Sequence, residues 1–318
     1  MNKILYIIAF FCLFGISRSA AQQEHQYTQF MYNKLVYNPA FAGAREVASV
    51  SALYRRQWLG FDGAPTSYMV NYDQPIMKNR IGFGLNIHRF AVGINDNYVG
   101  NMSYSYSIIR TDDLNLKVGI SGTFRQHKFN FSDPNFYIRD INDPFVGNAT
   151  EQTSISGNVG TGVYFTYKDF YVGFSVPNMY RNKIQIGNTV INSETREHYY
   201  AMAGGIFALS DNIDFKPSVL MKFVQNAPFS ADINASFLFN RKVTAGLSYR
   251  FGRSTMADSF DGLLFFQLAP KLGLGLAYDY NVSMLSSHNK GSIEALVRYD
   301  FSNPQKMKGD LTNPRYFF

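Results

Sequence analysis

Alternation between apolar and polar residues, repeated along most of the chain, is the feature that most constrains the fold. In FSADINASFLFN (229–240), apolar side chains occupy nearly every second position, and Ser, Asp and Asn fill most of the positions between them. The pattern returns in residues 243–251, 272–280 and 293–301. Successive side chains of a β-strand point to opposite faces of the sheet, so each segment is predicted to be a strand with one wet face.

The number and length of these segments favour a membrane barrel. Roughly fourteen of them follow Glu46, each of about ten to fourteen residues, whereas strands of soluble proteins usually have about five or six. No apolar run of ~18 residues follows residue 21, so no transmembrane helix is expected. We therefore predict an all-β fold: a single antiparallel transmembrane β-barrel of about 14 strands, spanning residues 46–301 in the outer membrane.

The connections between segments alternate between tight turns and longer links, as they do in outer-membrane barrels. Tight turns are expected at Lys168-Asp169, Ser210-Asp211, Asn240-Arg241 and Pro270-Lys271. The longer links are 131–152, 177–196, 252–258 and 281–290. We expect the tight turns to face the periplasm, because the mature chain is expected to start there and each hairpin returns there.

The chain is rich in aromatic residues, with 22 Tyr and 29 Phe, which suits two interfacial girdles facing lipid. A soluble β-sandwich or a lipocalin-like barrel is the alternative, and its apolar faces would point inward. Lipid favours an apolar outer band and permits Gly, Ser, Asn and Asp on the inner face. Outer-membrane lipid is thus an expected partner.

The ends of the chain lie outside the predicted barrel. Residues 1–21 have an early lysine, an apolar core and small residues before Gln22, as an export signal cleaved after Ala21 would have. A membrane anchor is the alternative, but the apolar run is shorter than the ~20 residues that a spanning helix needs. Residues 22–45 are expected to form a periplasmic or lumenal segment, and residues 302–318 a C-terminal periplasmic tail.

The stretch YNPAFAGA (37–44) belongs to no strand, because proline cannot donate to a ladder. It either packs against the barrel or binds a partner. The candidate residues are Tyr37, Asn38, Pro39, Phe41 and Gly43. Small residues on the inner face leave room for this segment or for the 131–152 link. They are Gly119, Ser121, Gly246, Ser248, Gly273 and Gly275.

Trp58, the only tryptophan, follows the first predicted strand and precedes a loop containing Gly63 and Pro65. It is either an interfacial belt residue or, with the loop, an anchor for a partner protein.

Five charged residues of the later strands are expected to face inward, where they either pair with one another or line a selective pore. They are Asp232, Arg250, Asp279, Glu294 and Arg298.

Signals for chemistry are weak. Cys12, the only cysteine, lies in the expected export signal, so the mature chain has no disulfide, thiol nucleophile or Cys-based zinc site. The sequence contains no HExxH and no GxSxG, and the glycine-rich 157–162 stretch lacks the lysine and helix of a phosphate loop. We therefore assign no catalytic, metal or cofactor residues and expect no nucleic-acid partner. A lipid-cleaving barrel would need a His and a Ser together on the lipid face.

Longer motifs resemble a known family. They are the opening QQEHQYTQFMYNKLVYNPAFAGA (22–44), YRRQWLGFDGAPTSY (54–68), GFSVPNMY (173–180) and LGLAYDYNVSMLSSHNKGSIEALVRYDF (274–301). Together they resemble the PorP/SprF family of type IX secretion outer-membrane proteins. The resemblance implies a cell-surface role without turnover chemistry, linking exported cargo such as gliding adhesins to the secretion machinery. The family has general and cargo-dedicated members, and both remain open here. The barrel pattern alone would instead suggest a passive or substrate-specific pore.

Overall fold

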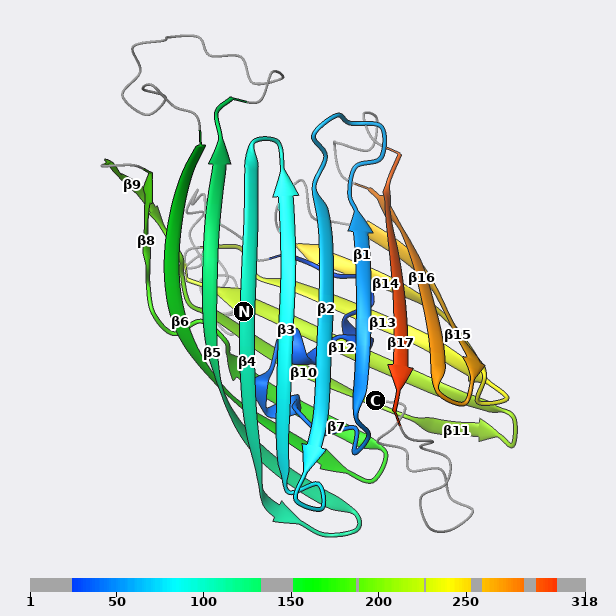
Figure 1. The fold of residues 1–318 in the computed structure, drawn as a ribbon. Coiled ribbons are helices and arrows are strands. Elements are labelled where there is room, and N and C mark those ends of the chain that lie inside the picture. Colours follow the sequence, from blue (N-terminus) through cyan, green and yellow to red (C-terminus); the bar gives the residue numbers. More distant parts are fainter. Residues whose placement is uncertain are drawn as a thin grey trace, which may run out of the picture.

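The wall of the molecule is a closed antiparallel β-barrel with fourteen strand positions (Figure 1). The computed structural model describes residues 25–132, 151–186, 189–225, 227–252, 259–282 and 290–301. β10 and β11 lie end to end and both pair with β12, so they share one position and close the barrel. The all-β barrel predicted from the alternation is confirmed.

The wall strands follow one another around the barrel in chain order. They are β1 (Ser49–Arg56), β2 (Thr66–Ile76), β3 (Ile81–Val92), β4 (Asn95–Arg110), β5 (Leu114–Asn130), β6 (Glu151–Tyr167), β7 (Phe170–Val176), β10 (His198–Gly205), β11 (Phe207–Ser210), β12 (Ile213–Val224), β13 (Ser230–Phe239), β14 (Val243–Gly252), β15 (Ser259–Ala269), β16 (Leu272–Asn281) and β17 (Ser292–Asp300). A separate hairpin, β8 (Lys183–Ile186) and β9 (Thr189–Glu194), lies in the connection between β7 and β10.

The two ends of the barrel differ in their connections. At the turn end, short turns join β2 to β3, β4 to β5, β6 to β7, β11 to β12, β13 to β14 and β15 to β16. At the loop end the connections are mostly longer, as between β1 and β2 or between β7 and β10. The link between β3 and β4 is an exception to the expected alternation, since Gly93 and Ile94 alone form a tight turn at the loop end.

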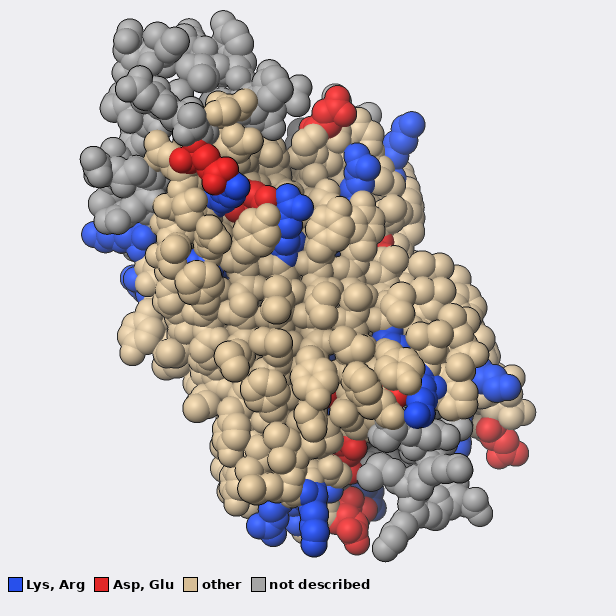
Figure 2. Space-filling model, in the orientation of Figure 1, with Lys and Arg blue, Asp and Glu red and all other residues tan. Residues whose placement is uncertain are grey.

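The polar residues of the strands face inward and the apolar residues face outward. In β13, Asp232 is 2% exposed and its neighbour Ile233 is 54% exposed; in β14, Leu247 is 73% exposed and Ser248 is buried. Figure 2 shows the result on one face: an uncharged band lies between two ends where charged side chains gather. Such a band fits contact with lipid and is the reverse of a soluble barrel.

Outward aromatic side chains form contacts near both ends of this band. Near the loop end, the ring centroids of Tyr54 and Tyr68 are 5.2 Å apart. Near the turn end, the rings of Phe215 and Phe237 are also 5.2 Å apart. Two such zones are typical of the girdles at the two membrane interfaces.

Strand lengths are less uniform than expected. β4, β5 and β6 have 16, 17 and 17 residues, whereas β7 has seven. The last pair between β6 and β7 is Thr161 with Val176, so residues 151–160 of β6 pair with β5 alone. A membrane requires only about 9–11 residues per strand, and β4 to β6 therefore continue beyond the wall at the loop end.

The residues before β1 lie inside the barrel, and we call residues 25–48 the lumenal segment (Figure 1, dark blue). It contains three short 3₁₀ turns, η1 (Phe30–Tyr32), η2 (Lys34–Val36) and η3 (Pro39–Phe41). Among the described residues, no helix has the length and apolar character needed to cross a membrane.

The lumenal segment runs from the loop end to the turn end. Thr28 binds Glu294, which pairs with Arg55 near the loop end of β1, whereas Glu46 binds Arg110, the last residue of β4, at the turn end. The described chain thus starts near the loop end. The described chain does not start beside the tight turns, contrary to the expectation, and the periplasmic location of those turns stays a prediction without that support.

A lumenal segment and a loop-end ion cluster form the candidate functional site

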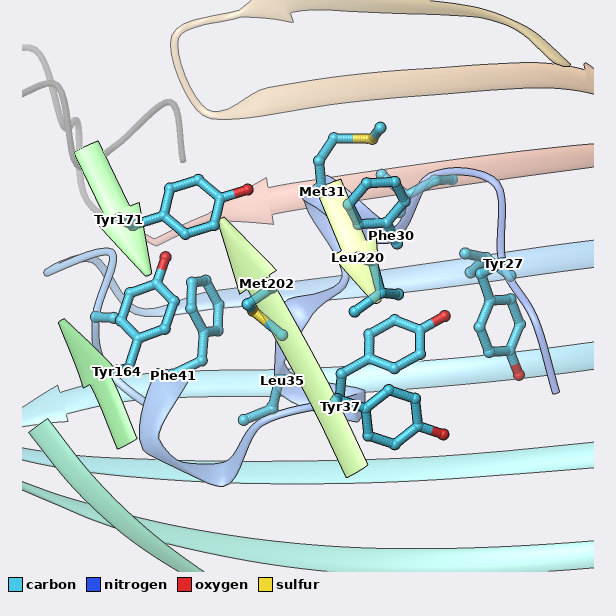
Figure 3. Packing of buried hydrophobic residues seen from close by; sticks show 14 of the residues in the cluster. Tyr27, Phe30, Met31, Leu35, Tyr37, Phe41, Tyr164, Tyr171, Met202 and Leu220 are labelled. Carbon is cyan, nitrogen blue, oxygen red and sulfur yellow. The ribbon is translucent and has the colours of Figure 1, made fainter. Parts of the chain in front are cut away.

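The lumenal segment supplies nearly half of the buried apolar core, and inward-facing wall residues supply the rest. Tyr27, Phe30, Leu35, Tyr37 and Phe41 are all buried, and they pack inside the wall rather than against another layer (Figure 3). Their wall partners are inward-facing residues of β6, β7, β10 and β12, among them Tyr164, Tyr171, Met202 and Leu220. These four belong to a larger set of inward-facing apolar wall residues, which includes Leu53, Leu263, Phe265 and Leu296, and together they give the segment its packing surface.

The NPA motif fixes the local shape of the segment. The Asn38 side chain accepts a hydrogen bond of 2.9 Å from the Ala40 N–H, and Pro39 occupies the first position of η3. An Asn cap followed by proline starts a helical turn, because the cap satisfies a backbone donor and proline has none to satisfy. Asn38 also donates to the Val163 carbonyl of β6 at 3.0 Å. One side chain thus shapes the turn and attaches it to the wall.

Several wall glycines are the surface on which the segment lies. A Cβ atom on Gly82 would collide with Ala42, one on Gly119 with Pro39 and Ala40, and one on Gly162 with the Asn38 amide. Of the glycines singled out in the sequence, Gly119 and Gly275 meet the segment, whereas Gly246 meets Ser236 and Gly273 meets Phe265. Only some of the inner-face glycines therefore make room for this segment.

Gly43 makes the sharp turn from the segment toward β1. Its φ is +65°, a region that glycine adopts without steric cost. An added Cβ would lie 2.8 Å from the Gly82 Cα, and the Gly43 N–H donates to Asp73 at 2.5 Å. The position therefore excludes a side chain for both conformational and spatial reasons.

Wall side chains also bind the backbone carbonyls of the segment. Ser175 of β7 donates to the Tyr37 carbonyl at 2.6 Å. Ser105 of β4 and Lys117 of β5 donate to the Ala42 carbonyl at 2.7 and 2.5 Å. These polar wall groups satisfy carbonyls that have no strand partner.

A buried ion cluster lies at the loop end of the lumen. Arg55 of β1 contacts Asp279 at 2.5 Å, Glu294 at 3.0 Å and the Thr28 hydroxyl at 2.9 Å. Glu294 accepts the backbone N–H groups of Thr28 and Gln29 at 3.0 and 2.9 Å. The Thr28 hydroxyl in turn donates to Asp279 at 2.6 Å. The cluster therefore holds the segment near its amino-terminal end.

A second group of charges continues this cluster along the wall. Asp232 contacts Lys222 at 2.5 Å and Arg250 at 2.8 Å, and Arg250 lies 3.7 Å from Asp279. Charges removed from water require partners of this kind. Asp232, Arg250, Asp279 and Glu294 are thus brought together, as part of one network.

Arg298 lies elsewhere, on the turn-end half of β17. It contacts Asp300 at 3.6 Å and lies over the Phe265 ring at 4.9 Å. Four residues that the sequence did not single out belong to the cluster or adjoin it: Arg55, Thr28, Lys222 and Asp261. Arg55 and Lys222 occupy inward positions of their strands, so the alternation could have placed them on the inner face.

Lys34 is a buried cation of the segment itself. Its ammonium lies 3.9 Å from the centroid of the Tyr171 ring. A cation over a ring is an attractive contact in a dry environment.

The Trp58 loop lies at the loop end and is joined to its neighbours. Trp58 is half-buried, Gly63 is exposed and Pro65 is buried. The Leu59 N–H donates to the Gly291 carbonyl and its own carbonyl accepts from the Lys290 N–H, both at 2.9 Å. The Gly63 carbonyl accepts from the Gly93 N–H at 3.0 Å. Three loop-end connections are thereby joined into one rim.

Solved structures similar to this chain are membrane barrels. CymD, a monoaromatic hydrocarbon channel, is 10% identical, with a TM-score of 0.51 over 86% of this chain and 92% of that chain. The toluene transporter TbuX of Ralstonia pickettii is 11% identical, with a TM-score of 0.50 over 84% and 92%. At this identity the likeness shows the fold alone. A comparison with curated proteins gives no match.

A match at the level of the family covers most of the chain. Residues 19–299 fit the family described as type IX secretion system membrane protein PorP/SprF. The match includes the lumenal segment, the Trp58 loop and every strand except the last residue of β17. The chain therefore belongs to the PorP/SprF family of type IX secretion system membrane proteins.

Proposed function

We propose that this protein is a non-enzymatic outer-membrane component of the type IX secretion system that captures, carries or anchors exported cargo. Surface or gliding adhesins are the cargo class that the family suggests. The loop end of the barrel faces the cell exterior and receives the cargo, and the turn end faces the periplasm. A signal peptide cleaved after Ala21 directs export.

The filled lumen is the observation that carries this proposal. Within the described residues, the lumenal segment occupies the barrel interior from the loop-end ion cluster to the turn end. A passive pore requires a continuous aqueous path, and large aromatic side chains of the segment lie where that path would run. A barrel closed in this way suits a binding or anchoring role better than free diffusion.

The loop-end rim is the proposed cargo surface. Trp58 is a half-buried aromatic residue on a loop that is hydrogen-bonded to two other connections. Aromatic residues on a supported rim are frequent anchors at protein interfaces. We assign to Trp58, Gly63 and Pro65 a role in presenting this rim.

Planar-bilayer recording and co-purification test the proposal together. We expect the intact protein to show no steady open-pore current and to co-purify with secreted cargo or secretion machinery from its own cells. Deleting residues 24–43 should leave a barrel that inserts but either conducts ions or loses those partners. Steady current through the intact protein, with no associated secreted protein, would instead support a passive or substrate-specific pore.

A Trp58→Ala variant addresses the rim, with Tyr68→Ala as its control because Tyr68 is an exposed aromatic residue of β2 outside the loop. Cargo recovery should fall with Trp58→Ala and persist with Tyr68→Ala. Equal recovery from both variants would remove Trp58 from the binding surface.

A further inference from the structure

The lumenal segment has two parts that are attached to the wall in different ways. We call residues 25–36 the arm and residues 37–48 the base. The base is followed directly by β1, so it is tied to the wall through the chain itself. The arm precedes the base and has its amino-terminal end near the loop end, where Thr28 meets Glu294.

Polar contacts to the base are spread around the barrel. They come from Asp73 of β2, Ser105 of β4, Lys117 of β5, Ser175 of β7 and Asp300 of β17, which contact Gly43, Ala42, Tyr37 and Arg45. Glycines of β3 and β5 add a close fit to its backbone, and Gly162 of β6 adds a close fit to the Asn38 side chain. No single wall residue is therefore responsible for holding the base in place.

Hydrogen bonds to the amino-terminal end of the arm converge on one place. Four hydrogen bonds join Thr28 and Gln29 to Arg55, Asp279 and Glu294. Asn33 adds a bond of 2.6 Å from Asn71, and Tyr32 stacks on Phe265 with ring centroids 4.4 Å apart. Glu294 has a special position because its two carboxylate oxygens bind both main-chain N–H groups and one also binds Arg55.

We propose that the arm is a releasable gate inside a permanently seated plug, and that Glu294, Asp279 and Arg55 are the latch that holds it closed. Release begins at the loop end, because the latched residues and the start of the described arm are both there. The base stays in the lumen when the arm leaves. A partner that approaches the loop end reaches the latched end of the arm first. The proposal concerns the barrel and its own segment and does not depend on which cargo is bound.

Two matched cysteine probes measure the arm and the base separately. Phe30 lies in the arm and Phe41 in the base, and both are buried. Each variant, Phe30→Cys or Phe41→Cys, replaces one buried phenylalanine with cysteine. The Cys12→Ala background makes that cysteine the only one in the chain. Maleimide labelling of the purified full-length protein should be slow at both cysteines while the latch is intact.

Breaking the latch should release the arm alone. Glu294→Gln removes the charge that binds Thr28, Gln29 and Arg55, and we expect labelling of Phe30→Cys to accelerate at least about tenfold while Phe41→Cys stays slow. Asp300→Asn is the control, since it removes an equally buried carboxylate that binds Arg45 of the base at 3.1 Å. It should not accelerate labelling of Phe30→Cys.

Other outcomes would overturn the proposal. Equal acceleration at both cysteines would mean that the segment moves as one body, and no acceleration at Phe30→Cys would mean that the three residues are no latch. Heat-modifiable gel migration identifies any variant that fails to fold. In that case Thr28→Val is used, because it removes two of the four latch hydrogen bonds and leaves the wall charges unchanged.

The position of the arm's end is tested in intact cells with an impermeant maleimide. His25→Cys marks the start of the described arm, Asp62→Cys marks the Trp58 loop and Asp169→Cys marks a tight turn. His25→Cys should label together with Asp62→Cys, whichever end faces the medium. Labelling that follows Asp169→Cys would place the arm's end at the turn end and refute a gate that opens toward the loops.

Discussion

The wall around the base and the wall around the loop-end cluster hold the lumenal segment by different means. Around the base, Gly82 and Gly119 have no side chain, so the wall backbone lies directly against the backbone of the segment, and Gly162 leaves room for the Asn38 side chain. At the loop end, Arg55 and Glu294 keep long charged side chains and meet the segment with hydrogen bonds. The base is therefore held by close glycine contacts together with dispersed polar contacts, whereas the amino-terminal end of the segment is held by hydrogen bonds to one charged cluster.

The largest loss of stability from a single substitution is expected in the buried ion cluster at the loop end. Asp232→Asn leaves Lys222 and Arg250 buried beside a neutral amide, and losing one partner of a buried pair costs about 3–5 kcal/mol. Asp96→Asn is the control, because its pair with Arg89 is largely exposed and such pairs contribute ~0–1 kcal/mol. Denaturant unfolding in lipid vesicles measures both losses. Similar losses of unfolding free energy in the two variants would mean that the cluster is hydrated and contributes little to stability.

A substitution on the lipid-facing side of β14 should have the next largest effect. Leu247 of β14 is the most exposed large apolar residue of the barrel wall, and an arginine near the bilayer midplane costs about 2–4 kcal/mol. Leu209 of β11 is 61% exposed but lies at the turn end, where the cost falls to about 0–1 kcal/mol. Leu247→Arg should therefore reduce assembly in the outer membrane much more than Leu209→Arg. Equal assembly would place Leu247 outside the lipid band.

Adding a single methyl group to a wall glycine that contacts the base should reduce the stability of the barrel. Gly119→Ala adds one methyl group against the backbone of Pro39 and Ala40, and overpacking of this kind costs about 1–3 kcal/mol. Gly100→Ala is the matched control, because its Cβ would meet nothing within 4 Å. Unfolding free energies of the two variants should differ by that amount. A neutral Gly119→Ala would show that the base does not lie tightly on β5.

Much of this comparison follows from local sequence pattern. Period-two alternation predicted the barrel, the inward direction of Asp232 and Glu294, and a glycine-lined inner face at Gly119. These features depend on which face a residue occupies, and that is decided by its immediate neighbours along the strand.

Other features depend on contacts between distant parts of the chain. Thr28 meets Glu294 across 266 residues, and no local pattern determines such a pairing. Arg298 faces inward as Glu294 does, yet it lies nearer the turn end and joins Asp300 instead of the cluster. Its depth in the barrel depends on strand register and tilt, which alternation does not reveal. The direction of the lumenal segment was missed for the same reason.

The smallest effect on stability is expected from a substitution of Asn38, whose side chain hydrogen-bonds both within the base and to β6. Asn38→Ala removes the cap on Ala40 and the bond to the Val163 carbonyl, and loss of a cap costs about 0.5–2 kcal/mol. Asn38→Ser keeps a neutral acceptor for the Ala40 N–H but is too short to donate to the Val163 carbonyl, so it should recover only the cap's share of the lost stability. Unfolding free energies of the two variants therefore divide the role of Asn38 between shaping η3 and attaching it to β6. If Asn38→Ser is as unstable as Asn38→Ala, attachment to the wall is the larger part, and the base is held by more than its fit to the glycines.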